Sequence, residues 1–137
     1  MFRTTIHPRV SETDALGHIN NTTVPVWFES GRHEIFKMFM PNLSFDNWKL
    51  VVVNLNIDYV SQIYFGKEVE ILTWIKKIGN RSFVVYEELH QNNNLCAKGT
   101  ATYVNLNLHT QESEPIPELI HGQLEAHMLY ENVKEEE

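Results

Sequence analysis

Four closely spaced segments with alternating apolar and polar residues constrain the fold of this chain more than any other feature. The segments are 50–60, 68–78, 81–91 and 95–108, and short polar turns separate the last three. Alternation with a period of two is typical of strands with one apolar face, and short turns join antiparallel neighbours. The sequence therefore predicts four long antiparallel strands, of which the last three are joined by short turns into a meander. A first strand is expected within residues 2–10.

One long helical pattern stands before these strands. The asparagines and threonine at 20–22 are good N-cap residues, and Pro25 is tolerated only in the first helical turn. Apolar residues then recur at helical spacing, which predicts a half-buried helix over 24–39. Gly31 falls on the apolar side and indicates close contact between helix and sheet rather than a break. Arg32 is expected on another face of the helix.

One helix and a long meander predict an α+β fold in which a curved antiparallel sheet wraps around the helix. A single helix cannot bury its apolar stripe alone, and a sheet needs one face covered. The β-branched strand at 50–60 would be a liability if left unpaired, so we expect it to pair with a second copy in a dimer. The 137 residues predict a single domain over 1–137, with a short helix near 118–128 and an acidic, frayed end from about 129.

Charge and composition argue against several classes of protein. The formal net charge of −7 argues against a nucleic-acid partner, because phosphate binding needs clustered Lys and Arg. Cys96 is the single cysteine, which excludes an internal disulfide and a cysteine-based zinc site. The histidines are scattered, and we expect no metal. No apolar run suits a signal peptide or a membrane span, so we expect a cytoplasmic protein that contacts no membrane.

The least ordinary chemistry of the chain lies in the polar loop before the helix. Asp14, His18, Asn20 and Asn21 fall close together there, and Gly17 supplies backbone freedom for a turn. The free N–H groups at a helix N-terminus stabilise negative charge, and a nearby carboxylate can serve as a base or a nucleophile. The loop is therefore a place where a substrate could be held.

These residues resemble a known family. The run Val-Ser-Glu-Thr-Asp-Ala-Leu-Gly-His-Ile-Asn-Asn at 10–21, with Trp-Phe-Glu at 27–29, is similar to the 4-hydroxybenzoyl-CoA thioesterase and acyl-CoA thioesterase group of the hotdog fold. The likeness extends over about 9–108 and includes Asn-Ile-Asp-Tyr at 56–59 and the Gly-Lys-Glu turn at 66–68. The resemblance implies a hotdog fold assembled as a homodimer or tetramer.

The resemblance also implies roles for single residues. Asp14 matches the position of the catalytic aspartate, and Asn21 lies where that type presents a backbone N–H to the thioester carbonyl. His18, with the two asparagines after it, resembles an element of plant acyl-carrier-protein thioesterases, which carry an asparagine where this chain has Leu16. Glu29 lies near the position of the catalytic glutamate in a sister type that lacks the loop aspartate.

Substrate-binding residues are expected on the loop, the helix and one strand. They are Gly17, Asn20, Trp27, Phe28, Asn56 and Asp58. The acyl group needs an apolar slot, which the helix stripe and one sheet face could line. Coenzyme A is expected as part of the substrate, with no separate cofactor, and the strand face of a second subunit is expected to border the site.

The expected reaction is hydrolysis of acyl-CoA to a free acid and coenzyme A, with Asp14 as general base or nucleophile. The alternatives are an acyl-carrier-protein thioesterase and a non-catalytic acyl-CoA binder or sensor of the same fold. Taken alone, Asp14 and Gly17 could form only an Asx-turn, His18 could be a structural hydrogen-bonder, and Glu29 could be a solvated helix residue. The sequence leaves open the length and aromaticity of the acyl group.

Overall fold

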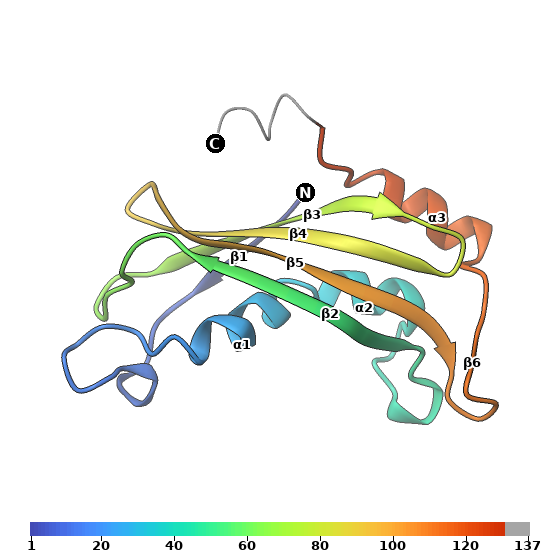
Figure 1. The fold of residues 1–137 in the computed structure, drawn as a ribbon, viewed down its shortest axis with the longest axis horizontal. Coiled ribbons are helices and arrows are strands. Elements are labelled where there is room, and N and C mark those ends of the chain that lie inside the picture. The colour runs from blue at the N-terminus through green and yellow to red at the C-terminus, as the bar shows by residue number, and fades with distance from the viewer. Residues whose placement is uncertain (131–137) are drawn as a thin grey trace.

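The computed structural model describes residues 1–130 and consists of a six-stranded antiparallel sheet that curves around helices on one face (Figure 1). The strand order is β1-β3-β4-β5-β2, with β6 paired to β5. The strands are β1 (Phe2–Ile6), β2 (Leu50–Tyr59), β3 (Val69–Ile78), β4 (Ser82–Gln91), β5 (Asn94–Asn107) and β6 (Glu112–Ser113). The predicted α+β fold with a curved antiparallel sheet is confirmed. Most of the expected acidic end lies outside the described residues.

Helices α1 (Thr23–Ser30) and α2 (His33–Phe39) follow one another under the sheet, and α3 (Glu118–Glu125) lies beside β3 (Figure 1). The first strand ends at Ile6 rather than near residue 10, because the chain turns into a short 3-10 helix, η1 (Val10–Glu12). A second 3-10 helix, η2 (Phe45–Asn47), lies in the connector before β2. No helix within residues 1–130 is long and apolar enough to cross a membrane.

The expectation of one unbroken helix over 24–39 is wrong, because the helix is interrupted at Gly31 and Arg32. The placement of Arg32 on another face is also wrong, since its side chain turns inward and only 4% of the residue is exposed. Its guanidinium donates to Glu87 Oε1 at 2.6 Å and to the Tyr103 hydroxyl at 2.8 Å. The helix is thus interrupted where Arg32 turns inward to pair with Glu87, and it does not follow the helical periodicity of the sequence at this point.

Close contact between helix and sheet at Gly31 is confirmed. An added Cβ would lie 2.6 Å from Glu87 Oε2, 2.7 Å from Ile71 Cγ2 and 2.9 Å from Thr73 Oγ1. These separations are shorter than ordinary van der Waals contacts, so no larger residue fits without a shift of the helix. The glycine lets the helix approach the sheet closely enough for Arg32 to reach Glu87.

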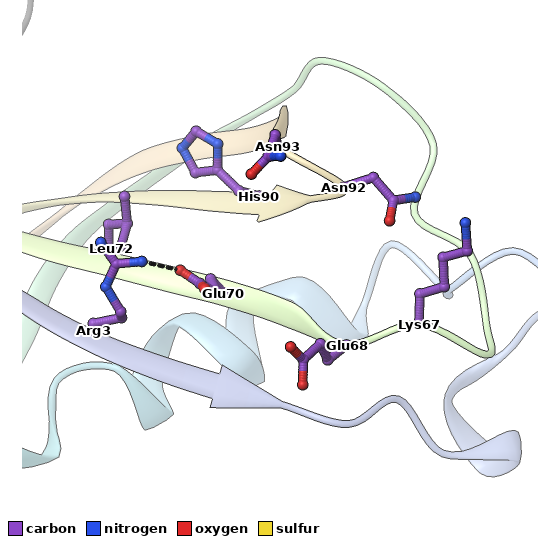
Figure 2. A pocket seen from close by; sticks show the side chains of 8 residues that line it. All are labelled: Arg3, Lys67, Glu68, Glu70, Leu72, His90, Asn92 and Asn93. Atoms are coloured by element: carbon purple, nitrogen blue, oxygen red, sulfur yellow. Dashed lines mark hydrogen bonds and ion pairs between the residues drawn. The ribbon is translucent and has the colours of Figure 1, made fainter.

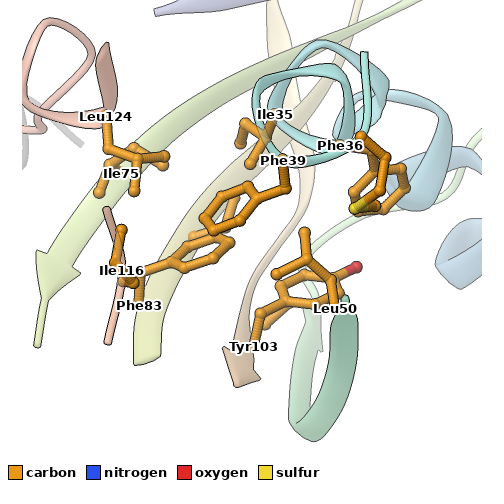
Figure 3. Close-up of a cluster of buried hydrophobic side chains, with 12 residues drawn as sticks. Ile35, Phe36, Phe39, Leu50, Ile75, Phe83, Tyr103, Ile116 and Leu124 are labelled. Atoms are coloured by element: carbon orange, nitrogen blue, oxygen red, sulfur yellow. The ribbon is translucent and has the colours of Figure 1, made fainter. Parts of the chain in front are cut away.

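The core consists of two apolar clusters. One lies near the polar loop and contains Val24, Trp27, Phe28 and their sheet neighbours. The other lies under α2 and α3, where Phe39 stacks on Phe83 with ring centroids 5.4 Å apart (Figure 3). Separate apolar packing at each end fixes the helices along the sheet.

Strand β2 forms one edge of the sheet, with β5 as its single strand partner among residues 1–130. Leu55, Ile57 and Tyr59 lie opposite the small, inward-facing residues of β5, so they share the helix side of the sheet. Asn56 and Asp58 alternate with them and occupy the other face. Leu55 is 45% exposed and Tyr59 is 52% exposed, so this edge carries apolar surface as well as open backbone groups.

Candidate active site

The loop before α1 folds back on itself as a narrow hairpin. Glu12 accepts a backbone hydrogen bond from Asn20, and the Asp14 N–H donates to the His18 carbonyl at 2.7 Å. Thr13 and Ile19 pair as an isolated antiparallel bridge between these two bonds. Asp14 is paired with His18 in this hairpin, and His18 precedes the helix cap Asn20 by two residues. Two residues of extended chain span roughly 7 Å, so the hairpin holds Asp14 near the start of α1.

Asp14 is held by the backbone of its own loop. Its Oδ1 accepts hydrogen bonds from the N–H of Leu16 at 2.7 Å and of His18 at 3.1 Å. The side chain remains 38% exposed, and Oδ2 lies 3.9 Å from His18 Nδ1, beyond hydrogen-bond distance. One carboxylate oxygen is thus anchored, while the other is accessible to a substrate or a water molecule.

Gly17 and His18 attach the tip of the loop to the segment after β2. Gly17 adopts a φ of +84°, a conformation that favours glycine, and its carbonyl accepts from Phe65 N–H at 3.3 Å. His18 bridges to Tyr64, and the two rings meet edge to face with centroids 5.1 Å apart. Ile19 N–H donates to the Ile63 carbonyl at 2.8 Å. These contacts hold the carboxylate of the loop in one place.

Glu12 ties the loop to the helix, and the sequence did not single it out. Its Oε2 accepts the Trp27 indole N–H at 2.9 Å, and its Oε1 accepts the backbone N–H of Arg9 at 2.7 Å. Burial alone would raise the pKa of Glu12, but the hydrogen bonds from Trp27 and Arg9 bring that pKa below its ordinary value. The hydrogen bond between Glu12 and Trp27 could have been predicted from a Glu just before the loop and a Trp on the helix that follows it.

The start of α1 leaves a backbone donor uncommitted. Asn20 acts as a local cap, since its Oδ1 accepts from Thr22 N–H and its carbonyl accepts from Thr23 N–H. Within residues 1–130, the backbone N–H of Asn21 donates to no acceptor. The Asn21 carbonyl is bound instead, by the Tyr59 hydroxyl at 2.7 Å. Tyr59 therefore fixes this turn from the end of β2, a role that the sequence did not indicate.

The other expected binding residues lie away from the open carboxylate. Trp27 and Phe28 are 3% and 1% exposed and belong to the core beneath the loop. Asn56 and Asp58 lie on the sheet face opposite the helices, in register with Thr100 and Lys98. A single subunit brings none of these four side chains to Asp14, and their proposed contacts with substrate stay predictions.

Glu29 lies apart from Asp14, at a cavity farther along the helix. It is six residues beyond Thr23, or about 9 Å along a helix axis. The cavity has a volume of about 440 Å³ and is lined mainly by aromatic and aliphatic side chains. The two candidate carboxylates are thus separated in one subunit.

A second hollow lies on the opposite face of the sheet, between β1, β3 and the turn after β4 (Figure 2). Its volume is about 550 Å³, but its charged groups have both signs. Arg3 is paired with Glu70 across it, and Lys67 is followed in the chain by Glu68. With charged groups of both signs and Leu72 as its one apolar lining residue, this hollow is a weaker candidate for an acyl group than the aromatic cavity.

Comparison with known proteins decides the family. The model of the thioesterase-like superfamily matches residues 8–124, most of the chain. The chain belongs to this superfamily. The matched residues include the Asp14 loop, the interrupted helix and the whole meander.

Solved structures of thioesterases share the fold. A predicted thioesterase from Bacillus stearothermophilus is 56% identical, with a TM-score of 0.91 over 93% of this chain and 96% of that one. A thioesterase from Thermus thermophilus, complexed with coenzyme A and Zn, is 26% identical, with a TM-score of 0.80 over 91% and 92% of the two chains.

An uncharacterized protein of Bacillus subtilis, YsmA, is 31% identical over 87 residues, which are 62% of this chain and 58% of that protein.

Membership in the thioesterase-like superfamily confirms the resemblance drawn from the loop and the predicted hotdog fold. It also confirms the expectation of a thioester hydrolase at the level of the family. Residues 1–130 hold no group of three or more His, Cys, Asp or Glu side chains arranged to bind a metal ion. That no metal takes part stays a prediction.

Proposed function

We propose that this chain hydrolyses acyl-CoA thioesters to a free acid and coenzyme A at the Asp14 loop. The observation that carries the proposal is that one hairpin holds an anchored, partly exposed carboxylate and leads to an uncommitted backbone N–H at the helix start. The coenzyme A bound to the Thermus thermophilus relative supports the choice of thioester. Coenzyme A enters as part of the substrate, without a separate cofactor, in a cytoplasmic protein.

Two routes are open to Asp14. As a general base, it takes a proton from water, and the resulting hydroxide attacks the thioester carbon. As a nucleophile, its free Oδ2 attacks that carbon directly, and water later hydrolyses the anhydride that forms. In either route the carbonyl oxygen becomes negative, and the Asn21 N–H and the positive end of α1 stabilise it. The C–S bond then breaks, and the coenzyme A thiolate leaves and takes up a proton. His18 and Gly17 hold the carboxylate, and Asn20 shapes the helix entry.

The proposed working unit is a homodimer joined through β2. Antiparallel pairing of this strand with its copy satisfies the open backbone groups of the edge and covers Leu55 and Tyr59. The Tyr59 end of β2 touches the loop of its own subunit, whereas the Leu50 end lines the aromatic cavity. The two-fold axis therefore sets each Asp14 loop beside the partner's cavity, so that loop and acyl pocket come from different chains.

The decisive experiment compares the two candidate carboxylates. Release of free thiol is followed with a panel of acyl-CoA substrates for wild type, Asp14→Asn and Glu29→Gln. We expect Asp14→Asn to lose about 10²–10⁴ in kcat, the usual contribution of a general base, and Glu29→Gln to lose far less. Full activity in Asp14→Asn, or no turnover of any acyl-CoA by wild type, would refute the proposal. A loss confined to Glu29→Gln would move the chemistry to the cavity.

A further inference from the structure

The aromatic cavity lies between α2, the connector 40–49 and the first half of β2. Its lining residues are Glu29, His33, Phe36, Leu43, Phe45, Trp48, Leu50, Val52 and Tyr103. Its volume of about 440 Å³ lies within the range of small-molecule pockets. An apolar space of this size, bordered by a few polar groups, suits one compact organic group.

Aromatic rings form much of the cavity wall. Phe36 meets Trp48 edge to face with ring centroids 5.6 Å apart, and Phe45 tilts against Trp48 at the same separation. Phe45 is nevertheless 84% exposed, although a large apolar ring gains free energy when it is covered. These rings offer faces and edges against which a planar group can pack.

Tyr103 lines the cavity and carries a hydroxyl group. Tyr103 accepts a hydrogen bond from Arg32 Nε at 2.8 Å, and Arg32 cannot accept one in return because a guanidinium has only donors. The Tyr103 hydroxyl donates to no acceptor within residues 1–130. Its own proton is therefore available to a bound ligand.

Buried partners fix the position of that hydroxyl. Arg32 is 4% exposed and is held by Glu87, whose second carboxylate oxygen accepts from Thr73 Oγ1 at 2.8 Å. The Tyr103 ring packs against Phe36 and Phe83, with centroids 5.6 Å away in both cases (Figure 3). A side chain restrained at both ends presents its donor in one direction, which is how a binding site gains selectivity.

We propose that the cavity takes an aromatic acyl group carrying a neutral oxygen acceptor, and that Tyr103 selects this group by donating a hydrogen bond to the oxygen. The inference rests on the proposed acyl-CoA hydrolysis and names its substrate class. A neutral acceptor is favoured over a carboxylate because Glu29 borders the same cavity and would repel a negative charge.

The test uses two acyl groups of nearly equal shape, 4-acetylphenylacetyl and 4-isopropylphenylacetyl. For calorimetry a methylene is inserted between the carbonyl carbon and the coenzyme A sulfur, which gives a non-hydrolysable thioether; for kinetics each acyl group is joined to coenzyme A as a thioester. We expect wild type to bind the ketone about tenfold more tightly, the range of one neutral hydrogen bond. In Tyr103→Phe the preference should fall to within about twofold, with a matching change in kcat/KM. Tyr130→Phe, a tyrosine 68% exposed and outside the cavity, should keep the wild-type preference.

Phe45→Ala provides a second variant, because this exposed ring can be removed without opening the core. We expect it to weaken binding of both aromatic thioethers about equally and by severalfold, since it removes packing but not the donor. Equal affinity of wild type for the two acyl groups, an unchanged preference in Tyr103→Phe, or an unchanged affinity in Phe45→Ala would overturn the inference. Thioether binding without hydrolysis of the thioesters would instead refute the proposed reaction and leave the selectivity standing.

Discussion

Substitution of Gly31 by alanine tests whether the close approach of helix and sheet holds this fold together. The residue has helical dihedral angles, φ −70° and ψ −12°, so alanine causes no backbone strain there. An added methyl group, however, meets Glu87, Ile71 and Thr73 at 2.6–2.9 Å. Two of these neighbours are β-branched and stiff, and the third is fixed by Arg32. None of them can move aside without disturbing the sheet or the ion pair.

The expected magnitude follows from two opposing effects. Forcing extra volume into a packed core costs about 1–3 kcal/mol. Replacing glycine by alanine in a helix gains about 0.5–1 kcal/mol. The steric cost is the larger, so we expect Gly31→Ala to lower the free energy of unfolding by about 1–2 kcal/mol.

Gly122→Ala is the matched control, because Gly122 lies within α3 and a Cβ there would meet nothing within 4 Å. It should raise the free energy of unfolding by about 0.5–1 kcal/mol. Urea unfolding, followed by far-ultraviolet circular dichroism, measures both variants against wild type. A Gly31→Ala protein as stable as wild type, or changes of the same sign in both variants, would refute the steric reasoning.

Three further predictions concern the buried ion pair, the loop and the sheet edge. Burial raises the pKa of Glu87 to about 7 despite the opposing charge of Arg32. The folded state therefore keeps the Glu87 proton at a higher pH than the unfolded chain does, and the free energy of unfolding should fall as the pH rises from about 4.5 to 7. Glu87→Gln should flatten this pH dependence. An identical pH dependence in both proteins would contradict the raised pKa of Glu87. Glu12→Gln should lower kcat by severalfold with little change in the far-ultraviolet spectrum, because a neutral amide anchors the Trp27 indole more weakly than the carboxylate does; unaltered kcat would show that this anchor is dispensable. Leu55→Lys should halve the mass measured by light scattering, since it puts a charged side chain on the edge strand that the proposed β2 pairing covers, and an unchanged mass would exclude that interface.

The loop and the meander could be predicted from the sequence because local rules govern both. A period of two marks the strands from β2 to β5, and Asn and Gly clusters mark their turns. Asp14 and Gly17 lie only a few residues apart, so the turn that anchors the carboxylate forms from adjacent backbone. The same local geometry serves an Asx-turn, which is why the catalytic role proposed for Asp14 rests on the family resemblance and not on spacing.

The buried layer under the helix could not be predicted, because its members are far apart in the chain. Arg32 and Glu87 are separated by 55 residues, and Arg32 has the hydrophilic character that helical periodicity assigns to solvent. Only the close approach at Gly31 brings the two side chains together, and once buried together each is satisfied by the other. Only the tertiary structure therefore places Arg32 in the core, where it donates a hydrogen bond to the Tyr103 hydroxyl, and only the tertiary structure shows the interruption of the helix at Gly31 and Arg32.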